Sequence, residues 1–239
     1  MKTMKVMTFN IQHALDYQKD IINIDLFVDA IKKYGVEFCG LNEVRGEGPI
    51  DGYTDQTKTI ADRLSFYGYF GEAIKVCGTS PYGNAAVSRY PFKSIETIHI
   101  PDPQKQNELS RDGEPVHYES RCIIKAILNV CEKDICILVT HFGLAASERK
   151  SAVNTLCSII DSINIPMILM GDFNTEPDDE ILTPLFERMK CAGEMLPTFP
   201  SYDPKIKIDY ILYKGLECKS SETVKEIYAD HLPIIAEFI

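Results

Sequence analysis

The 239-residue sequence contains no tryptophan, and its lysine and arginine residues never form a block longer than a pair. Proteins that capture long DNA or RNA normally present a basic face, whereas this chain carries a formal net charge of −10. Nucleic acid therefore remains a possible partner, but the charge does not favour it.

No apolar run approaches the roughly 18 residues that a membrane-spanning helix needs, and no apolar stretch typical of a signal peptide follows Met1. Cys-x-x-Cys pairs are also absent, and most of the eight cysteines lie at irregular spacings inside apolar runs. Such thiols are typical of buried hydrophobic positions rather than of zinc ligands or a disulfide framework. Because reduced thiols fit the cytosol, we expect a cytoplasmic protein without a membrane span.

Apolar residues make up 45% of the chain and charged residues 25%, as in an ordinary globular protein. Periodicity predicts helices at 23–34 and 147–163, the second with Ser147 as its N-cap. Both helices separate β-rich stretches, which predicts helices on the outer faces of packed sheets. No linker divides the chain, so we expect one domain over residues 1–239. Strand-like runs lie at 4–9, 36–41, 69–76, 84–88, 121–130, 134–140, 166–170, 208–213, 216–227 and 232–238, and shorter helices are predicted at 58–66 and from Asp178.

Six polar clusters, each following an apolar strand-like run, are the most informative feature of the chain. Binding and catalytic groups favour such strand ends on a rigid scaffold. The clusters combine carboxylates, imidazoles and amides, and no serine or cysteine motif typical of a covalent nucleophile accompanies them. This inventory suits attack of water on phosphorus assisted by Mg²⁺. The clusters are Thr8-Phe9-Asn10, Leu41-Asn42-Glu43-Val44, Thr140-His141-Phe142, Gly171-Asp172-Phe173-Asn174, Ile208-Asp209-Tyr210 and Asp230-His231.

Asp172 and Asn174 lie two residues apart after a buried run, and strand alternation would place them on the same side. The carboxylate and the carboxamide could then hold a water molecule and remove its proton, while Phe173 packs inward. The alternative is a turn in which both side chains make only local hydrogen bonds.

Asp230 and His231 are adjacent at the start of the last strand-like run, so their side chains should point in opposite directions. The carboxylate that orients His231 should then come from elsewhere, and Asp209 in the neighbouring run is the natural candidate. A histidine held in this way can stay protonated near neutral pH and donate to a phosphoryl oxygen. The alternative for His231 is an ordinary strand-end histidine.

Glu43 follows a buried strand, where a carboxylate is costly unless it is paired or binds a cation. Mg²⁺ commonly takes one or two protein carboxylates, and Glu43 is the first candidate ligand. Asn10 could orient Glu43 or a metal-bound water. The alternatives are a surface ion pair between Glu43 and Arg45 and a turn-forming role for Asn10.

Three further residues are candidates for contact with a phosphate group. His141 could reach a phosphoryl oxygen or could bond only to the backbone. Arg121 could hold a phosphate through its planar fork or could form a surface salt bridge. Asn84 is the third candidate for binding the substrate. Specificity should reside in the segments 45–57, 101–119 and 188–207, and the second of these lacks periodicity, which predicts a mobile loop.

Taken together, these motifs resemble the endonuclease/exonuclease/phosphatase superfamily of deoxyribonuclease I-like, metal-dependent hydrolases. They follow the family's order and cover nearly the whole chain, from Phe9-Asn10 to Asp230-His231. The specific matches lie at 41–44, 82–91, 171–174, 208–211 and 230–233.

The resemblance implies an α/β (α+β) fold, a four-layer α/β/β/α sandwich of two mainly antiparallel sheets flanked by helices, with the site at one sheet edge. It also implies Mg²⁺ or Mn²⁺ held mainly by Glu43, with Asn10 and Asp230 nearby. By the same resemblance, Asp172 and Asn174 would position the attacking water, and Asp209 would orient His231. His231 and His141 would stabilise the charge on the phosphoryl group.

Three positions depart from the superfamily's pattern and argue against a DNA-repair role. Gln12 stands where abasic-site nucleases carry an acidic residue, Asn42 replaces a common Gln, and Ala229 stands where many members have Ser. We therefore expect a divalent-metal-dependent phosphoesterase that acts on a phosphodiester or phosphomonoester. A small, nucleotide or lipid-derived phosphate fits better than long DNA. The alternatives are a nuclease acting on DNA or RNA and a non-catalytic module that binds phosphorylated ligands.

Overall fold

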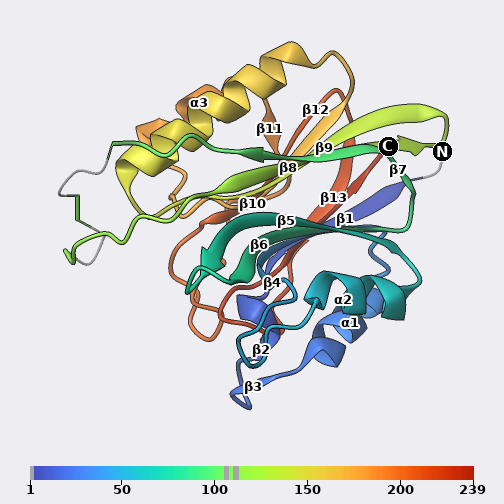
Figure 1. Cartoon of the computed structure of the whole chain (residues 1–239). Coiled ribbons are helices and arrows are strands. Elements are labelled where there is room, and N and C mark those ends of the chain that lie inside the picture. Colours follow the sequence, from blue (N-terminus) through green and yellow to red (C-terminus); the bar gives the residue numbers. More distant parts are fainter. Residues whose placement is uncertain (1–2, 105–107, 110–112) are drawn as a thin grey trace.

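Two β-sheets lie face to face between two layers of helices in the computed structural model, which describes residues 3–104, 108–109 and 113–239 (Figure 1). This arrangement confirms the predicted four-layer α/β/β/α sandwich. The first sheet contains β1 (Met4–Asn10), β4 (Phe38–Arg45), β5 (Tyr67–Val76), β6 (Ser80–Ser88), β13 (Cys218–Thr223) and β14 (Ile234–Phe238). The second contains β7 (Phe92–His99), β8 (Cys122–Val130), β9 (Lys133–His141), β10 (Met167–Asp172), β11 (Lys190–Cys191) and β12 (Asp209–Lys214).

Helices cover the outer face of each sheet. The helices α1 (Ile24–Lys33) and α2 (Gln56–Leu64) lie on the first sheet, and α3 (Ala146–Ser162) and α4 (Thr183–Phe186) lie on the second (Figure 1). The small elements are η1 (Gln12–Ala14), η2 (Glu180–Leu182), β2 (Leu15–Asp16) and β3 (Ile21–Ile22). No helix within the described ranges is both long and apolar enough to cross a membrane.

The two sheets run in the orders β13-β14-β1-β4-β6-β5 and β11-β12-β10-β9-β8-β7. Among the described strands, pairing is antiparallel except between β1 and β4 and between β9 and β10. The first of these pairs sets Asn10 beside Asn42, and the second sets Asp172 beside His141. Because the carboxyl ends of parallel strands meet at one sheet edge, these four polar residues gather at one edge of the sandwich.

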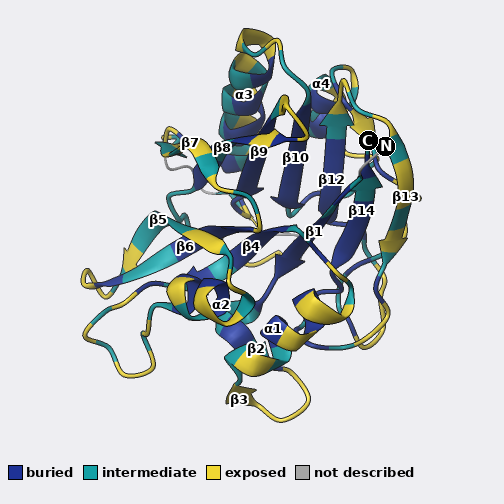
Figure 2. Cartoon of the chain, turned by 90° about the vertical axis from the view of Figure 1, so that its right-hand side faces the viewer, coloured by how far each residue is buried: buried dark blue, intermediate teal, exposed yellow. Residues whose placement is uncertain are grey.

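Apolar side chains hold this edge in place. Val6, Phe38 and Ile137 lie between the two sheets, whereas Phe9 packs against Phe27 of α1 with their ring centroids 5.4 Å apart. Figure 2 shows the central strands buried and the helices exposed only on their outer sides. Burying one such side chain contributes about 1.5–3 kcal/mol, so a rigid interior supports the polar strand ends.

The two long helices occur where periodicity predicted them, but one cap differs. The side-chain oxygen of Asn23 accepts a hydrogen bond from the Leu26 amide at 3.3 Å and begins α1. The prediction of Ser147 as the N-cap of the second helix was wrong, because α3 begins at Ala146 and its N-cap is Ala145. The Glu148 carboxylate accepts a hydrogen bond from the Ala145 amide at 3.0 Å and satisfies the helix terminus in place of a serine.

Two polar clusters lie differently from their predicted places at strand ends. The strand predicted at 36–41 continues as β4, with a register shift between Leu41 and Val44 where Glu43 adopts a left-handed φ of 58°. Asn42 and Glu43 therefore lie inside a bulged strand. Bulges commonly re-aim a side chain beside a functional site. At the other end of the chain, β14 begins at Ile234, so the pair at 230–231 belongs to the segment before it.

The remaining differences concern the second sheet and the long loop. The predicted hairpin at 121–140 is present as β8 and β9, whereas the two edge strands, β7 and β11, were not predicted. In the loop at 101–119, Leu109 pairs with Pro115 in an isolated bridge. Part of the predicted mobile loop, at 105–107 and 110–112, lies outside the described residues.

Candidate active site

A hollow of about 360 Å³ opens at the sandwich edge where the two parallel strand pairs end. Acidic, basic and aromatic side chains from both sheets and five loops line it. They are Glu43, Tyr82, Glu119, Arg121, His141, Leu144, Asp172, Asn174, Phe199, Asp230 and His231. The structure thus brings together most of the residues that the sequence singled out.

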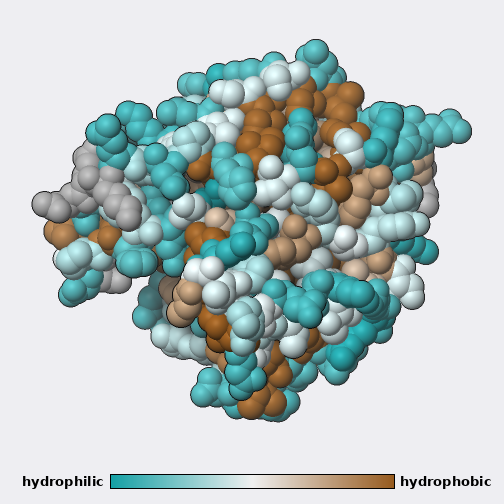
Figure 3. Space-filling model, in the orientation of Figure 1, coloured by the Kyte–Doolittle hydropathy of each residue, from teal (hydrophilic) through white to brown (hydrophobic). Residues whose placement is uncertain are grey.

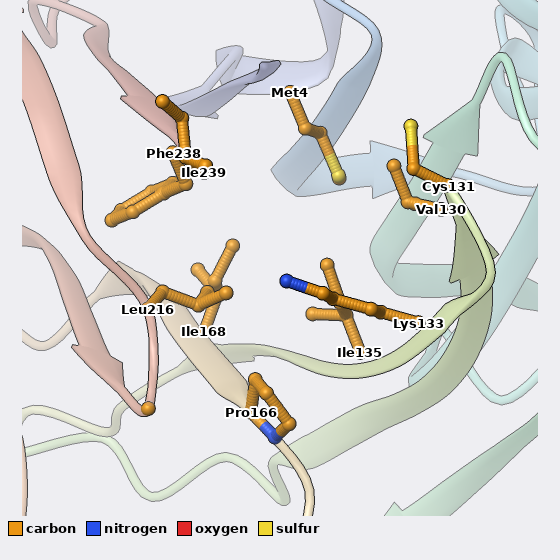
Figure 4. A pocket seen from close by; sticks show the side chains of 11 residues that line it. Met4, Val130, Cys131, Lys133, Ile135, Pro166, Ile168, Leu216, Phe238 and Ile239 are labelled. Atoms are coloured by element: carbon orange, nitrogen blue, oxygen red, sulfur yellow. The ribbon is translucent and has the colours of Figure 1, made fainter. Parts of the chain in front are cut away.

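A second hollow, of about 250 Å³, lies at the opposite end of the sheets, where β1, β9 and β10 begin (Figure 4). Aliphatic groups such as Ile135 and Ile168 dominate its wall, and the Lys133 amine points into it. Among the described residues that line it, Lys133 carries the only side-chain charge. Without carboxylate or imidazole side chains, this hollow does not suit ester hydrolysis.

His231 is held between two buried carboxylates in the first hollow. Its Nδ1 lies 2.9 Å from Asp209 Oδ2, and its Nε2 lies 3.6 Å from Asp172 Oδ2. Burial opposes charge on the imidazole, but Asp209, Asp172 and Asp230 together outweigh it and raise the pKa of His231 to about 10. His231 is therefore protonated at neutral pH. The structure places Asp209 beside His231 as predicted. The role of Asp209 in orienting the imidazole for catalysis stays a prediction.

Asp172 reaches its place because β10 comes unusually close to β9. Gly171 has a φ of 147°, and a Cβ there would lie 1.8 Å from the Thr140 carbonyl oxygen, so only glycine fits. The Asp172 amide then donates to Asn42 Oδ1 at 3.0 Å, and Asp172 Oδ2 accepts from Asn10 Nδ2 at 3.1 Å. Burial, reinforced by the charge of nearby Asp209 and opposed by His231, raises the pKa of Asp172 to about 7.

Asn174 joins Asp172 to the second histidine. The sequence offered a local turn and a functional site as alternatives; the structure contains the local turn and also places Asn174 at the hollow, and its functional role stays a prediction. Asn174, at a left-handed φ of 46°, donates its amide to Asp172 Oδ1 at 2.8 Å. Its side-chain nitrogen lies 3.1 Å from His141 Nε2. Burial first, then the charges of Arg121 and His231, lower the pKa of His141 well below its usual value, so His141 is neutral.

Glu43 and Asp230 form an acidic pair on the other side of the hollow. Glu43 Oε1 accepts from Asn10 Nδ2 at 2.9 Å, and Oε2 accepts from the Tyr82 hydroxyl at 2.8 Å. Burial and the charge of Glu43, opposed by His231, raise the pKa of Asp230 to about 6. The predicted alternative for Glu43, an ion pair with Arg45, is not formed, because the Arg45 guanidinium lies over the Tyr53 ring at 4.7 Å.

The donor set fits a hard divalent cation at Glu43 and Asp230. Within the described chain, the buried oxygens Asp230 Oδ1 and Asp209 Oδ1 both lack a hydrogen-bond partner. At Glu43 and Asp230, two carboxylates that repel each other would gain from a cation between them. Asp172, Asp209 and His231 also bring ligand atoms within 4.8 Å of one another. That cluster fits a metal less well, because His231 is protonated and already bonded to Asp209, and only a neutral imidazole can ligate.

Asn84 and Asn42 lie behind the hollow and support its floor. Asn84, predicted to bind substrate, is buried: its side-chain nitrogen donates to the Cys122 carbonyl at 3.1 Å, and its oxygen accepts from Asn42 Nδ2 at 2.8 Å. Both ends of this amide are occupied inside the protein, so its contacts place it in support of the site rather than against a ligand. Asn42 also donates to the Thr140 carbonyl at 2.9 Å.

Arg121 forms a salt bridge, one of the two alternatives that the sequence left open, and its contact with phosphate stays a prediction. Its guanidinium lines the hollow and also pairs with Glu119, with 3.0 Å between Nη2 and Oε2. The sequence did not single out Glu119, Tyr82, Leu144 or Phe199. Tyr82 lies inside the motif at 82–91, and Glu119 and Phe199 lie in the segments 101–119 and 188–207 where specificity was expected, whereas Leu144 carried no signal.

The sequence matches one family model over most of its length. The model described as the PGAP2IP C-terminal nuclease-like domain covers residues 1–226. A UPF0294 protein of Vibrio vulnificus strain YJ016 is 30% identical over 104 residues, which cover 41% of this chain and 36% of that protein. The chain thus matches little more than a third of that relative's length.

Solved structures share the fold at low sequence identity. An endonuclease/exonuclease/phosphatase from Beutenbergia cavernae has a TM-score of 0.79 and 21% identity, over 100% of this chain and 72% of that chain. ANGEL2, a 2′,3′-cyclic phosphatase, has a TM-score of 0.75 and 14% identity, over 99% and 95%. A mannosyl-6-phosphatase from Bacteroides thetaiotaomicron has a TM-score of 0.72 and 12% identity, over 99% of both chains.

Proposed function

The chain belongs to the family of the PGAP2IP C-terminal nuclease-like domain, within the endonuclease/exonuclease/phosphatase superfamily, and we propose that it is a divalent-metal-dependent phosphoesterase. The observation that carries this proposal is the meeting of Glu43, Asp172 and His231, far apart in the chain, around one hollow. Buried ionisable groups are costly, and a cluster of them with shifted pKa values in a cleft is typical of a catalytic site.

Asp172 and Asn174 would hold the attacking water, and Asp172 would accept its proton. A pKa of about 7 suits a general base that works near neutral pH. The hydrogen bonds from Asn10 and from the Asn174 amide hold both oxygens of Asp172 and keep the carboxylate in one orientation. This fixed placement would align the water with phosphorus before reaction.

The two histidines would act differently. His231, protonated and fixed by Asp209, would donate from Nε2 to a phosphoryl oxygen as negative charge develops. The sequence predicted the same role for His141, but a neutral ring whose Nε2 faces the Asn174 amide suits orientation of Asn174 instead. We therefore assign His141 to positioning.

Glu43 and Asp230, with Asn10, would hold the Mg²⁺ or Mn²⁺ ion. When bound, a divalent cation supplies positive charge beside the phosphate oxygens and so stabilises the charged transition state. The protein prepares this place by fixing Glu43 with hydrogen bonds from Asn10 and Tyr82. The unpartnered Asp230 oxygen supports the same assignment.

The similar proteins support the general class of substrate. Two of them are named as phosphatases, one for a 2′,3′-cyclic phosphate and one for mannose 6-phosphate groups. We propose a small, nucleotide or lipid-derived phosphate ester as the substrate, because a formal net charge of −10 does not favour long DNA or RNA.

Hydrolysis of bis(p-nitrophenyl) phosphate with Mg²⁺ or Mn²⁺ tests the proposal. We expect activity that EDTA abolishes, and a loss of about 10²–10³-fold in kcat/KM for Asp172→Asn, because a positioned charge is removed. Asp178→Asn is the matched control, since Asp178 is an exposed aspartate on the same segment and its loss should leave the rate unchanged.

The outcomes separate the alternatives. Activity that survives EDTA, or that persists in Asp172→Asn, would contradict the mechanism. Metal and phosphate binding by calorimetry without turnover of any phosphate ester would favour the non-catalytic module. Faster cleavage of single-stranded DNA or RNA than of small esters would favour the nuclease.

A further inference from the structure

The hollow is poor in positive charge for a site that must accept phosphate. Arg121 is the only lysine or arginine among its described lining residues, and Glu119 pairs with it. The side chain of Arg121 is 12% exposed and that of Glu119 is 35% exposed, so water screens the pair only partly. The Glu119 carboxylate neutralises the guanidinium that would attract phosphate, so its presence should affect which phosphate esters bind.

Glu119 is held at the wall of the hollow by its backbone. Its amide donates to Glu148 Oε1 at 2.9 Å, and Glu148 Oε2 accepts from the Ala145 amide at 3.0 Å. Glu148 is only 5% exposed, so this anchor is buried. The anchor does not involve the Glu119 side chain, and a substitution of that side chain leaves it in place.

The charges around the hollow limit how much negative charge a ligand can bring. Four carboxylates line the hollow, those of Glu43, Glu119, Asp172 and Asp230, and Arg121 is the one guanidinium among its described lining residues. A bound divalent cation would offset two of these carboxylates and Arg121 a third, so the wall would carry no excess of positive charge. A ligand with one negative charge fits such a site, whereas a second negative charge would meet Glu119 without a free cation to oppose it.

Two apolar side chains, Phe199 and Leu144, also line the hollow. The Phe199 ring lies 4.8 Å from the His231 ring, between centroids, and Leu144 is 47% exposed. A leaving alcohol or a second ester group without negative charge would find apolar contact there.

We propose that Glu119 is a specificity-determining residue that selects singly charged phosphodiesters of neutral or cationic alcohols over doubly charged phosphomonoesters. This inference rests on the proposed function and narrows its substrate class. Glu119 acts through charge: it neutralises Arg121 and repels a second phosphate charge.

Three p-nitrophenyl esters with one shared leaving group test the inference near pH 8 with saturating Mg²⁺. They are p-nitrophenyl phosphocholine, bis(p-nitrophenyl) phosphate and p-nitrophenyl phosphate, with formal charges of about 0, −1 and −2 given a second phosphate pKa near 6. Because their intrinsic reactivities differ, the readout is the change in the ratio of kcat/KM values between wild type and variant.

We expect Glu119→Gln to raise kcat/KM for the monoester by ~10-fold relative to the diester, as follows from removing one unit charge a few Å away at intermediate screening. Glu119→Lys should shift the ratio further in the same direction. Asp161→Asn is the matched control: Asp161 pairs with Arg188 at 2.9 Å on the far end of α3, and its loss changes the net charge equally. The control should leave the ratio unchanged.

Two results would overturn the inference. If Glu119→Gln and Glu119→Lys leave the ratio at its wild-type value while all three esters are hydrolysed, the selection by charge is wrong and the phosphoesterase stands. If the wild type hydrolyses no ester with Mg²⁺ or Mn²⁺, the proposed function is wrong, and the inference about Glu119, which rests on it, is wrong as well.

Discussion

At the scale of single residues, the two buried histidines of the hollow differ in charge because their neighbours differ. Three carboxylates surround His231 and keep it protonated, whereas Arg121 and His231 itself, together with burial, keep His141 neutral. One site therefore holds a positively charged donor and a neutral acceptor a short distance apart. In the proposed mechanism, His231 would stabilise charge and His141 would position Asn174.

The Asp209→Asn substitution tests this arrangement. The pKa of His231 is raised from 6.5 to about 10, so its charge stabilises the fold fully below pH 6.5 and less as pH rises through 10. Removal of the Asp209 charge should lower the pKa of His231 and move the upper end of that window to lower pH. NMR titration of the imidazole signals measures the shift directly.

The exposed His99 on β7 is the internal control, because it lies outside the hollow and its NMR signal should be the same in the wild type and in Asp209→Asn. Thermal unfolding midpoints across the same pH range give a second readout. An unchanged titration of His231 in Asp209→Asn would show that Asp209 does not hold the imidazolium.

The sequence predicted the polar residues that line the hollow better than the partners that hold them. Asp172, Asn174 and His231 follow apolar runs in recognisable motifs, so pattern alone finds them. Glu119 lies in a loop without periodicity, and its pairing with Arg121 depends on the buried Glu148 anchor. Such a partner is set by distance in space, which no local pattern carries.

At the scale of elements, Asn42 joins the edges of the two sheets. It sits on β4 of the first sheet, donates to the Thr140 carbonyl of β9 and accepts from the Asp172 amide of β10. Asn42 is fully buried, so no water can replace these bonds. Together with Asn10, which donates to Asp172, and Asn84, which donates to the Cys122 carbonyl, Asn42 fixes the distance between the sheets at the site.

We expect Asn42→Ala to lower the free energy of unfolding by about 2–4 kcal/mol, because it leaves buried backbone groups unsatisfied. Chemical denaturation measures this loss, and kcat should fall with it as Asp172 moves. Asn129→Ala is the matched control, since the exposed Asn129 on β8 donates only to Asp134. Equal losses for the two variants would contradict the bridging role.

The elements themselves were largely predictable, and their irregular points were not. Apolar runs gave nearly every strand of the two sheets, but the bulge in β4 at Glu43 arises from pairing with β6, which is a contact between distant segments. The N-terminus of α3 is likewise capped by Glu148 instead of the predicted Ser147. The Glu148 carboxylate accepts from the Ala145 amide at the helix terminus and from the Glu119 amide of the neighbouring loop. Tertiary contacts override the local preference in both places.

At the scale of the whole molecule, two parallel strand pairs from different sheets end at the same edge. That topology brings Asn10 and Asn42 of the first sheet against His141 and Asp172 of the second. The ordered motifs predicted a shared site only through their resemblance to a family, since no single motif fixes the position of another. The superposition of the sheets is what brings the proposed cation ligands Glu43 and Asp230 and the proposed base Asp172 around one hollow.

The most direct test of the account is the position of a bound cation. Crystals soaked with Mn²⁺ and phosphate, with anomalous scattering recorded near the manganese edge, locate the ion without any assumption about activity. We expect the main anomalous peak at Glu43 and Asp230, with phosphate between the ion and His231. A peak at the Asp172, Asp209 and His231 cluster, or none in this hollow, would contradict it.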